Sequence, residues 1–287
     1  MKKLKQIHTN KELHWVGDGF PVRNIFSYNE FSKELSPFLM MDYAGPTRFS
    51  ATEKKLGVGE HPHRGFETVT IIYDGEVEHR DSGGGGGLIR KGEVQWMTAG
   101  SGVVHEEYHG HQYSKTGGPF EMVQLWVNLP QKDKMTKPRY QALTNDLIPE
   151  ISLPNGAGAV RLFAGQYGSK RGPAQTFSPM NLWDMRLVAG TKTSLEIPEG
   201  HTAALFVLSG TINLPSGEKV DDAYMAIFEK EGDSLEFASS SDAKVLLMSG
   251  QAIDEPVVGY GPFVMNTKAE ISQAIEDYQT GKMGHLH

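Results

Sequence analysis

The chain has 287 residues, enough for about two domains at roughly 100–200 residues per domain. It carries 28 Lys and Arg against 35 Asp and Glu, and the resulting net charge of −7 argues against the basic surplus of a nucleic-acid-binding protein. It has no Cys, which excludes disulfides and cysteine-ligated metals, so any metal must bind nitrogen and oxygen ligands.

The N-terminal segment is basic, but no apolar run follows it as in a secretory signal. The longest apolar runs, such as residues 203–208, fall far short of the roughly 18 residues that span a bilayer. We therefore expect a soluble, cytoplasmic protein that binds neither membranes nor nucleic acid directly. We also expect it to be a monomer.

Short β-type segments recur along the chain, separated by Gly, Asp, Asn and Pro. A spacing of about 8–12 residues is typical of β-sandwiches and β-barrels rather than of alternating strands and helices. We therefore predict an all-β fold. The predicted strands are residues 68–73, 76–80, 92–97, 122–129, 182–188, 205–208 and 244–248.

A segment rich in Pro and charged residues, 128–155, suits a connection between two halves. We place the boundary near residue 135, with an N-terminal domain of residues 1–135 and a C-terminal domain of residues 136–287. Both halves contain an apolar strand that runs into a Gly turn, at residues 70–79 and 205–214. This similarity favours a degenerate repeat of one β-barrel unit.

One helix is predicted near the end of the chain, at about residues 267–280. Thr267 and Glu270 have the spacing of a capping box, and Gly281 would end the helix. Its apolar face, with helical spacing, would consist of Ile271, Ala274, Ile275 and Tyr278.

Two pairs of alternate residues carry side chains that bind metals. These are His61 and His63 in GEHPHRGFE, and His105 and Glu107 in SGVVHEEYHG. Because alternate side chains on a strand share one face, two such pairs on facing strands would converge. Three imidazoles and one carboxylate suit a divalent Fe, Ni, Cu, Mn or Zn ion and leave open positions on an octahedral metal. A structural site would more often be a closed tetrahedron.

Other polar residues near these motifs leave alternatives open. Glu67 lies an even number of residues from His63, so it is a rival ligand or else a hydrogen-bond acceptor for a ligand imidazole. Glu106 should face away from its neighbours, into solvent. One face of the next predicted strand carries Phe120, Met122, Gln124 and Trp126. We expect these four residues to pack in the core, and the alternative is that they line the metal pocket.

Several long motifs closely resemble the pirin family of the cupin superfamily. They are HPHRGFETVT (61–70), HRDSGGGGGLIRKGEVQWMTAGSGVVHEE (79–107), MVQLWVNLP (122–130), SPFLMMDYAGP (36–46) and GPFVMNTKAEISQAI (261–275). The resemblance implies a bicupin, with two antiparallel, jelly-roll-like β-barrels in one chain and a metal in the N-terminal barrel only. Carried over by motif position, the ligands are His61, His63, His105 and Glu107. Glu67 then lies outside the ligand set.

We expect one divalent ion per chain, Fe(II) first, with Ni, Cu, Mn or Zn as alternatives. The second half lacks an equivalent set. When Gly210 is aligned with Gly75, the positions of the four ligands are taken by Glu196, Pro198, Ser240 and Asp242. We therefore expect the C-terminal barrel to have a structural role.

The resemblance implies two functions. Several pirins and other bicupins are quercetin 2,3-dioxygenases, which open a chelating flavonol with dioxygen and release carbon monoxide. We interpret the chain as an oxidoreductase of this type, with Glu107 as the catalytic base. Pirins are also described as binding transcription regulators and, in bacteria, a pyruvate dehydrogenase component. The alternative is therefore a metal-dependent regulator that binds a transcription factor or a metabolic enzyme.

Overall fold

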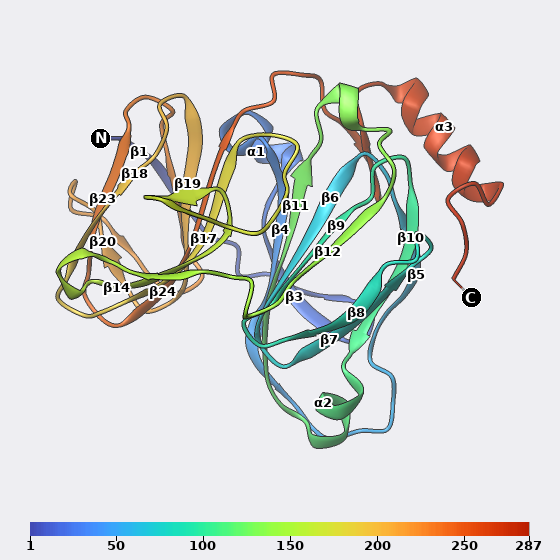
Figure 1. Cartoon of the computed structure of the whole chain (residues 1–287), viewed down its shortest axis with the longest axis horizontal. Helices are drawn as coiled ribbons and strands as arrows, with labels where there is room; N and C mark the ends of the chain where they lie inside the picture. Colours follow the sequence, from blue (N-terminus) through green and yellow to red (C-terminus); the bar gives the residue numbers. More distant parts are fainter. Residues whose placement is uncertain (287) are drawn as a thin grey trace. The chain divides into compact units, whose positions relative to one another are not determined.

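The computed structural model describes residues 1–286, and β-strands dominate it (Figure 1). All seven predicted strands coincide with or overlap observed ones, so the all-β prediction is confirmed. The chain divides into two compact units. The larger unit comprises Lys11–Glu30, Phe38–Asn145 and the chain from Ile253 onward; the smaller unit comprises Met1–Asn10, Phe31–Pro37 and Asp146–Ala252.

The larger unit contains two main antiparallel sheets. The seven-stranded sheet has the order β12 (Arg139–Leu143), β9 (Val94–Thr98), β6 (Phe66–Asp74), β11 (Gly118–Asn128), β4 (Phe38–Phe49), β3 (Phe20–Ser27) and β2 (Leu13–Val16). The four-stranded sheet has the order β5 (Gly57–His63), β10 (Val103–His109), β7 (Glu76–Asp81) and β8 (Gly86–Arg90). A hairpin is formed by β25 (Val258–Tyr260) and β26 (Phe263–Met265).

The smaller unit also contains a seven-stranded and a four-stranded sheet. The first has the order β1 (Leu4–His8), β22 (Met225–Phe228), β19 (His201–Ser209), β24 (Ala243–Gln251), β17 (Met180–Leu187), β14 (Gly158–Ala164) and β13 (Glu150–Ser152). The second has the order β18 (Lys192–Glu196), β23 (Ser234–Ser239), β20 (Ile212–Asn213) and β21 (Lys219–Val220). A small hairpin is formed by β15 (Gln166–Tyr167) and β16 (Lys170–Arg171).

Helices are few and short. They are α1 (Tyr28–Leu35), α2 (His111–Thr116) and α3 (Lys268–Gln279), with the 3-10 turns η1 (Gln131–Asp133) and η2 (Pro154–Gly156).

The two units repeat one topology, strand for strand. The order β12-β9-β6-β11-β4-β3-β2 corresponds to β1-β22-β19-β24-β17-β14-β13, and β5-β10-β7-β8 corresponds to β18-β23-β20-β21. Gly75 and Gly210 follow the equivalent strands β6 and β19, with φ of 90° and 84°, a region that favours glycine. The internal repeat predicted from these Gly turns is confirmed, and the chain contains two copies of one antiparallel β unit, as the expected bicupin fold requires.

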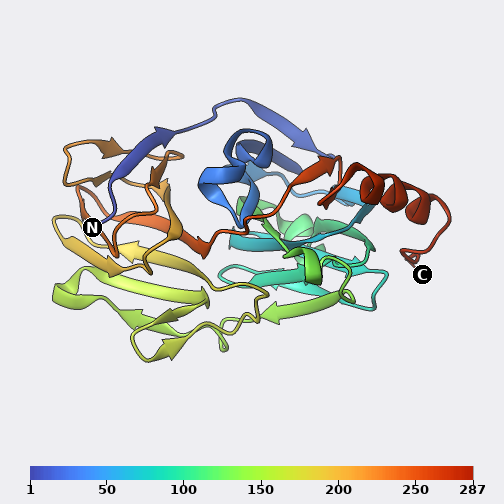
Figure 2. The same ribbon diagram turned by 90° about the horizontal axis from the view of Figure 1, so that it is seen from above.

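The units are interleaved in the sequence, unlike the contiguous domains 1–135 and 136–287 that we expected. The reason is that the terminal segments complete units formed mainly by other parts of the chain. Strand β1 pairs with β22, with Leu4 opposite Phe228, and Figure 2 shows this dark-blue strand beside the orange strands of the smaller unit. The chain from Ile253 onward, including α3, belongs to the larger unit.

The inward side chains of the larger unit change from apolar to polar along its strands. Ile72 of β6 pairs with Met122 of β11, and both lie in a buried apolar cluster with Phe20, Val77 and Phe120. One inward position further along, Thr70 pairs with Gln124. Part of this barrel is therefore an apolar core, and the next part offers polar groups to a site.

Helix α3 begins with the predicted capping box. The Thr267 side chain accepts from the Glu270 backbone N–H, and the Glu270 carboxylate accepts from the Thr267 N–H at 2.7 Å. Ile271 and Ala274 are buried in a cluster with Val104, Phe263, Met265 and Met283. The predicted helix is confirmed, but Tyr278 is 39% exposed and lies outside its buried face.

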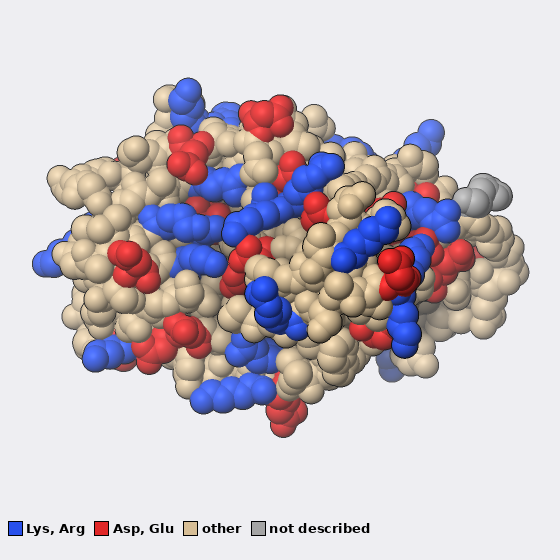
Figure 3. Space-filling view, turned by 90° about the horizontal axis from the view of Figure 1, so that it is seen from below, with Lys and Arg blue, Asp and Glu red and all other residues tan. Residues whose placement is uncertain are grey.

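Charged side chains of both signs are interspersed on the face shown in Figure 3. Among residues 1–286, no helix has the length and apolar character needed to cross a bilayer.

Candidate metal centre

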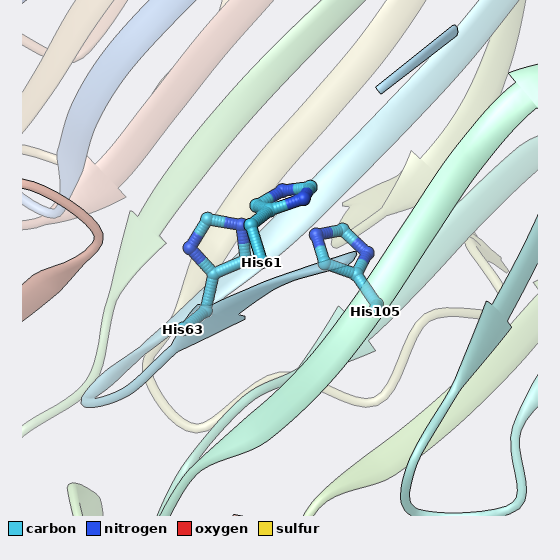
Figure 4. Close-up of side chains that lie close together, drawn as sticks. All are labelled: His61, His63 and His105. Carbon is cyan, nitrogen blue, oxygen red and sulfur yellow. The ribbon is translucent and has the colours of Figure 1, made fainter. Parts of the chain in front are cut away.

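Strands β5 and β10 bring three histidines together. In their antiparallel pairing, His61 lies directly opposite His105, and His63 lies opposite Val103. A register shift between His61 and Val58 adds one residue to β5, which is the geometry of a β-bulge. All three imidazole rings point toward one another (Figure 4).

The spacing of the rings suits one metal ion. Ring centroids are 4.3 Å apart for His61 and His105, 4.8 Å for His63 and His105, and 4.9 Å for His61 and His63. One nitrogen from each ring lies within 4.8 Å of the others. Nitrogens bound at about 2.1 Å to one ion are at most about 4.2 Å apart, so small ring rotations would close the site.

The protonation states also suit metal binding. His63 and His105 are 4% and 0% exposed, and burial, followed by the neighbouring imidazoles, lowers the pKa of both well below the usual histidine range. Both rings are therefore neutral. His105 Nε2 is buried without a hydrogen-bond partner, which is costly unless something binds it. The Nδ1 of His61 lies 2.8 Å from the Gly59 carbonyl, which leaves its Nε2 available. These donors fit a divalent transition metal.

The fourth predicted ligand, Glu107, does not belong to the cluster formed by the three histidines. Its Oε2 accepts from Gln124 Nε2 at 3.0 Å, and its Oε1 lies 3.2 Å from Thr70 Oγ1 and 3.4 Å from Gln95 Nε2. The carboxylate lies close to His105 and His79, in a second cluster of metal-binding atoms. The structure thus groups three of the four predicted ligands and places Glu107 beside one of them.

His79 and Asp81 of β7 also lie at this site, although they were not among the predicted site residues. Their side chains are 0% and 3% exposed, and His79 Nε2 lies 3.1 Å from Asp81 Oδ2. The burial of β7 alternates residue by residue, so the same alternate-residue rule that singled out His61 and His63 applies to this pair.

The four residues that share a face of β11 divide between core and site. Phe120 and Met122 lie in the apolar cluster, as expected. Gln124 donates to Glu107, and the ring of Trp126 lies 5.4 Å from that of His63. Gln124 and Trp126 therefore contact residues of the predicted metal site, whereas Phe120 and Met122 pack in the core.

Glu67 belongs to neither cluster of metal-binding atoms. Its Oε1 accepts from Thr98 Oγ1 at 2.6 Å, and its Oε2 is buried without a partner. Burial raises its pKa to about 7, although the hydrogen bond from Thr98 opposes the shift. The observed hydrogen bond of Glu67 is therefore with Thr98 of β9 and not with a ligand imidazole.

Glu106 is not solvated, and that expectation is wrong. Its side chain is only 8% exposed because it accepts from Arg80 Nε at 2.6 Å and lies 3.3 Å from Lys55 Nζ. It does face away from its neighbours' side of the strand, but ion pairs cover it there.

Replacing Glu67 by Gln should remove a pH-dependent loss of stability. A carboxyl whose pKa rises from 4.5 to about 7 on folding favours unfolding increasingly as pH rises through that window, by roughly 3 kcal/mol in total. The free energy of unfolding of the variant relative to the wild type should therefore be greater at about pH 8 than at about pH 4. Urea unfolding of the metal-free proteins measures this difference, and equal relative stabilities at both pH values would contradict the assignment.

In the smaller unit, the strands that correspond to β5 and β10 contribute apolar residues to the core. Leu195 of β18 lies opposite Leu235 of β23, and both are buried in the apolar core of this unit. The ungapped alignment with Ser240 and Asp242 is wrong at this point, because β23 ends at Ser239.

Comparison with known proteins gives consistent matches over the whole chain. The family model Pirin matches residues 19–127, and the model described as Pirin C-terminal cupin domain matches residues 182–284. The chain is 53% identical to a Pseudomonas aeruginosa protein named "Putative quercetin 2,3-dioxygenase", over all of both chains. It is 40% identical to a "Pirin-like protein" of Solanum lycopersicum, covering 93% of this chain and 88% of the relative. A crystal structure of quercetin 2,3-dioxygenase from Acinetobacter baumannii, 52% identical, covers both chains completely with a TM-score of 0.97.

Proposed function

This chain belongs to the pirin family, and from that premise we propose that its larger unit binds one divalent transition metal ion through His61, His63, His105 and Glu107. The observation that carries the proposal is the convergence of three imidazoles, with the buried Nε2 of His105 directed to the other two rings without a hydrogen-bond partner (Figure 4). Glu107 would join by turning from Gln95 and Gln124 toward the three rings. Fe(II) is our first candidate, since an N/O donor set admits several metals.

We further propose that the chain is a metal-dependent dioxygenase of the quercetin 2,3-dioxygenase type. The relatives that carry this name support the reaction class, since two of them are 52% and 53% identical to this chain over its whole length. When bound, a divalent metal would act as a Lewis acid on two neighbouring oxygens of a flavonol-like substrate.

The residues around the cluster have defined tasks in this proposal. His61 is the most exposed of the three histidines, so substrate would approach past it. Trp126, beside His63, offers an aromatic edge to a planar ring. Glu107 would take the proton of the chelating hydroxyl as general base. As base, Glu107 would occupy the position observed here, where Gln124 and Thr70 contact its carboxylate, and not the position turned toward the rings.

Replacing Glu107 by Gln should lower metal-dependent dioxygen uptake with quercetin by about 100-fold or more, because an amide cannot accept the proton. The matched control is Glu106→Gln, which changes the adjacent carboxylate on the opposite face and should leave uptake near that of the wild type. Oxygen-electrode rates normalised to bound metal measure the effect. A Glu107→Gln rate equal to that of the wild type would exclude Glu107 as the base.

A regulatory role would use the same metal site with a transcription factor or a metabolic enzyme as partner. This role stays the alternative to the dioxygenase. Dioxygen uptake with quercetin would favour the dioxygenase, and metal binding without uptake would favour the regulator.

A further inference from the structure

A line of hydrogen bonds leads from Asp81 through His79 to His105 inside the larger unit. Asp81 Oδ2 lies 3.1 Å from His79 Nε2, and His79 Nδ1 lies 3.2 Å from His105 Nδ1. All three side chains are buried. Tyr140 stacks on the His79 ring, with centroids 5.2 Å apart and planes 18° from parallel. Packing therefore fixes the orientation of the middle ring.

The chemistry of the end group sets the direction of each hydrogen bond. An ionised carboxylate can only accept, so His79 must carry its proton on Nε2. Gln95 Nε2, a donor, lies 3.3 Å from His79 Nδ1, so this nitrogen acts as an acceptor and also accepts from the Nδ1–H of His105. The remaining nitrogen of His105, the Nε2 that lacks a hydrogen-bond partner, consequently has a lone pair too.

We propose that Asp81 and His79 are positioning residues that hold His105 in its Nδ1-protonated tautomer, with the Nε2 lone pair directed to the metal cluster. For His61 a single backbone carbonyl, that of Gly59, does the same by accepting from Nδ1. Metal-ligating histidines commonly have their second nitrogen fixed by such a partner. The inference rests on the proposed function in taking His105 as a ligand, but the tautomer is a property of the metal-free protein.

The same residues offer one competing arrangement, because His79, His105 and Glu107 also form a cluster that could hold an ion. The surroundings favour the hydrogen bonds. Gln95 Nε2 lies 3.3 Å from His79 Nδ1, so a second donor already faces the nitrogen that such an ion would need. The number of ions bound per chain distinguishes the two arrangements.

Asp81→Asn is the sharpest test because the structure dictates how the new amide must lie. Asp81 Oδ1 accepts from the backbone N–H groups of Gly83 and Gly85, at 2.8 and 2.9 Å. In the variant the amide oxygen would keep these two bonds, and the amide NH2 would point at His79 Nε2. His79 would then be protonated on Nδ1, and His105 would shift its proton to Nε2, which blocks the ligand lone pair.

The experiment combines long-range proton–nitrogen correlation spectra of the metal-free full chain with Zn(II) affinity measured by chelator competition. We expect Asp81→Asn to convert His105 to the Nε2-protonated tautomer and to weaken Zn(II) binding by about 10–100-fold. Glu78→Gln, an amide substitution at an exposed position of the same strand, should change neither quantity. An unchanged His105 tautomer, an unchanged affinity, or a second Zn(II) ion lost on mutation of His79 would overturn the proposal.

Two variants of His79 serve if Asp81→Asn does not fold. His79→Gln retains an amide that can accept from His105 and donate to Asp81, whereas His79→Leu does neither. We expect the Gln variant to bind Zn(II) more tightly than the Leu variant and to keep more of the Nδ1-protonated His105. Equal Zn(II) affinity and equal His105 tautomer populations in the two variants would contradict the proposed positioning of His105 by Asp81 and His79. Neither readout uses substrate, so failure of the dioxygenase proposal would leave this test intact.

Discussion

Replacing His105 by Ala should abolish stable metal binding. His105 lies opposite His61 on the paired strand, and its buried Nε2 is directed to the other two rings without a hydrogen-bond partner (Figure 4). Its removal leaves two imidazoles on one strand, so we expect affinity to fall by more than the roughly 100-fold typical of losing a residue that only supports a ligand. Metal content per chain after dialysis, measured by atomic spectroscopy, reports the effect.

The matched control is His111→Ala, which removes an exposed histidine of the short helix α2. This variant should retain the metal content of the wild type. Full metal content in His105→Ala would show that the cluster is not the binding site.

The second large effect concerns stability and comes from a buried lysine. Lys134 is 2% exposed, and its Nζ donates to Gly65 O, Asn128 Oδ1 and Val264 O, at 2.8, 2.8 and 2.9 Å. Burial lowers its pKa to about 8, but three acceptors satisfy the ammonium group. Lys134→Met should lower the free energy of unfolding by roughly 3–5 kcal/mol, because three buried acceptors lose their donor.

Urea unfolding measures this loss, which is a large part of the roughly 5–15 kcal/mol of a typical domain. Lys132→Met, at an exposed position two residues earlier, is the control and should change stability by less than about 0.5 kcal/mol. A Lys134→Met variant as stable as the control would mean that the three hydrogen bonds contribute nothing net.

Much of the fold could be predicted from local sequence patterns. The strands around residues 68–73 and 205–208 are short apolar runs that end at a Gly, and this shared pattern predicts the repeat. The structure shows why Gly stands there, because both turn glycines have positive φ. The C-terminal helix could be placed from its capping box. The three histidines could be grouped because alternate residues share a strand face and the two segments pair directly.

What the sequence did not reveal depends on contacts between distant segments. The pairing of β1 with β22 interleaves the units, and no local pattern at Leu4 indicates it. The partners of Glu106 lie on β7 and in the loop before β5, so its ion pairs follow from tertiary packing. Helix α2 has only six residues, too few for a recognisable apolar period.

The most direct test of the account is the release of carbon monoxide from quercetin. Protein stripped of metal and reloaded in turn with Fe(II), Ni(II), Cu(II) or Mn(II) would be supplied with quercetin and dioxygen, with His105→Ala treated in parallel. We predict that wild-type protein loaded with one of these metals consumes dioxygen and releases carbon monoxide in equal amounts, and that the metal-free protein and the variant do neither. If the wild type binds one ion but releases no carbon monoxide with any of the four metals, the dioxygenase proposal is wrong and the regulatory alternative is favoured.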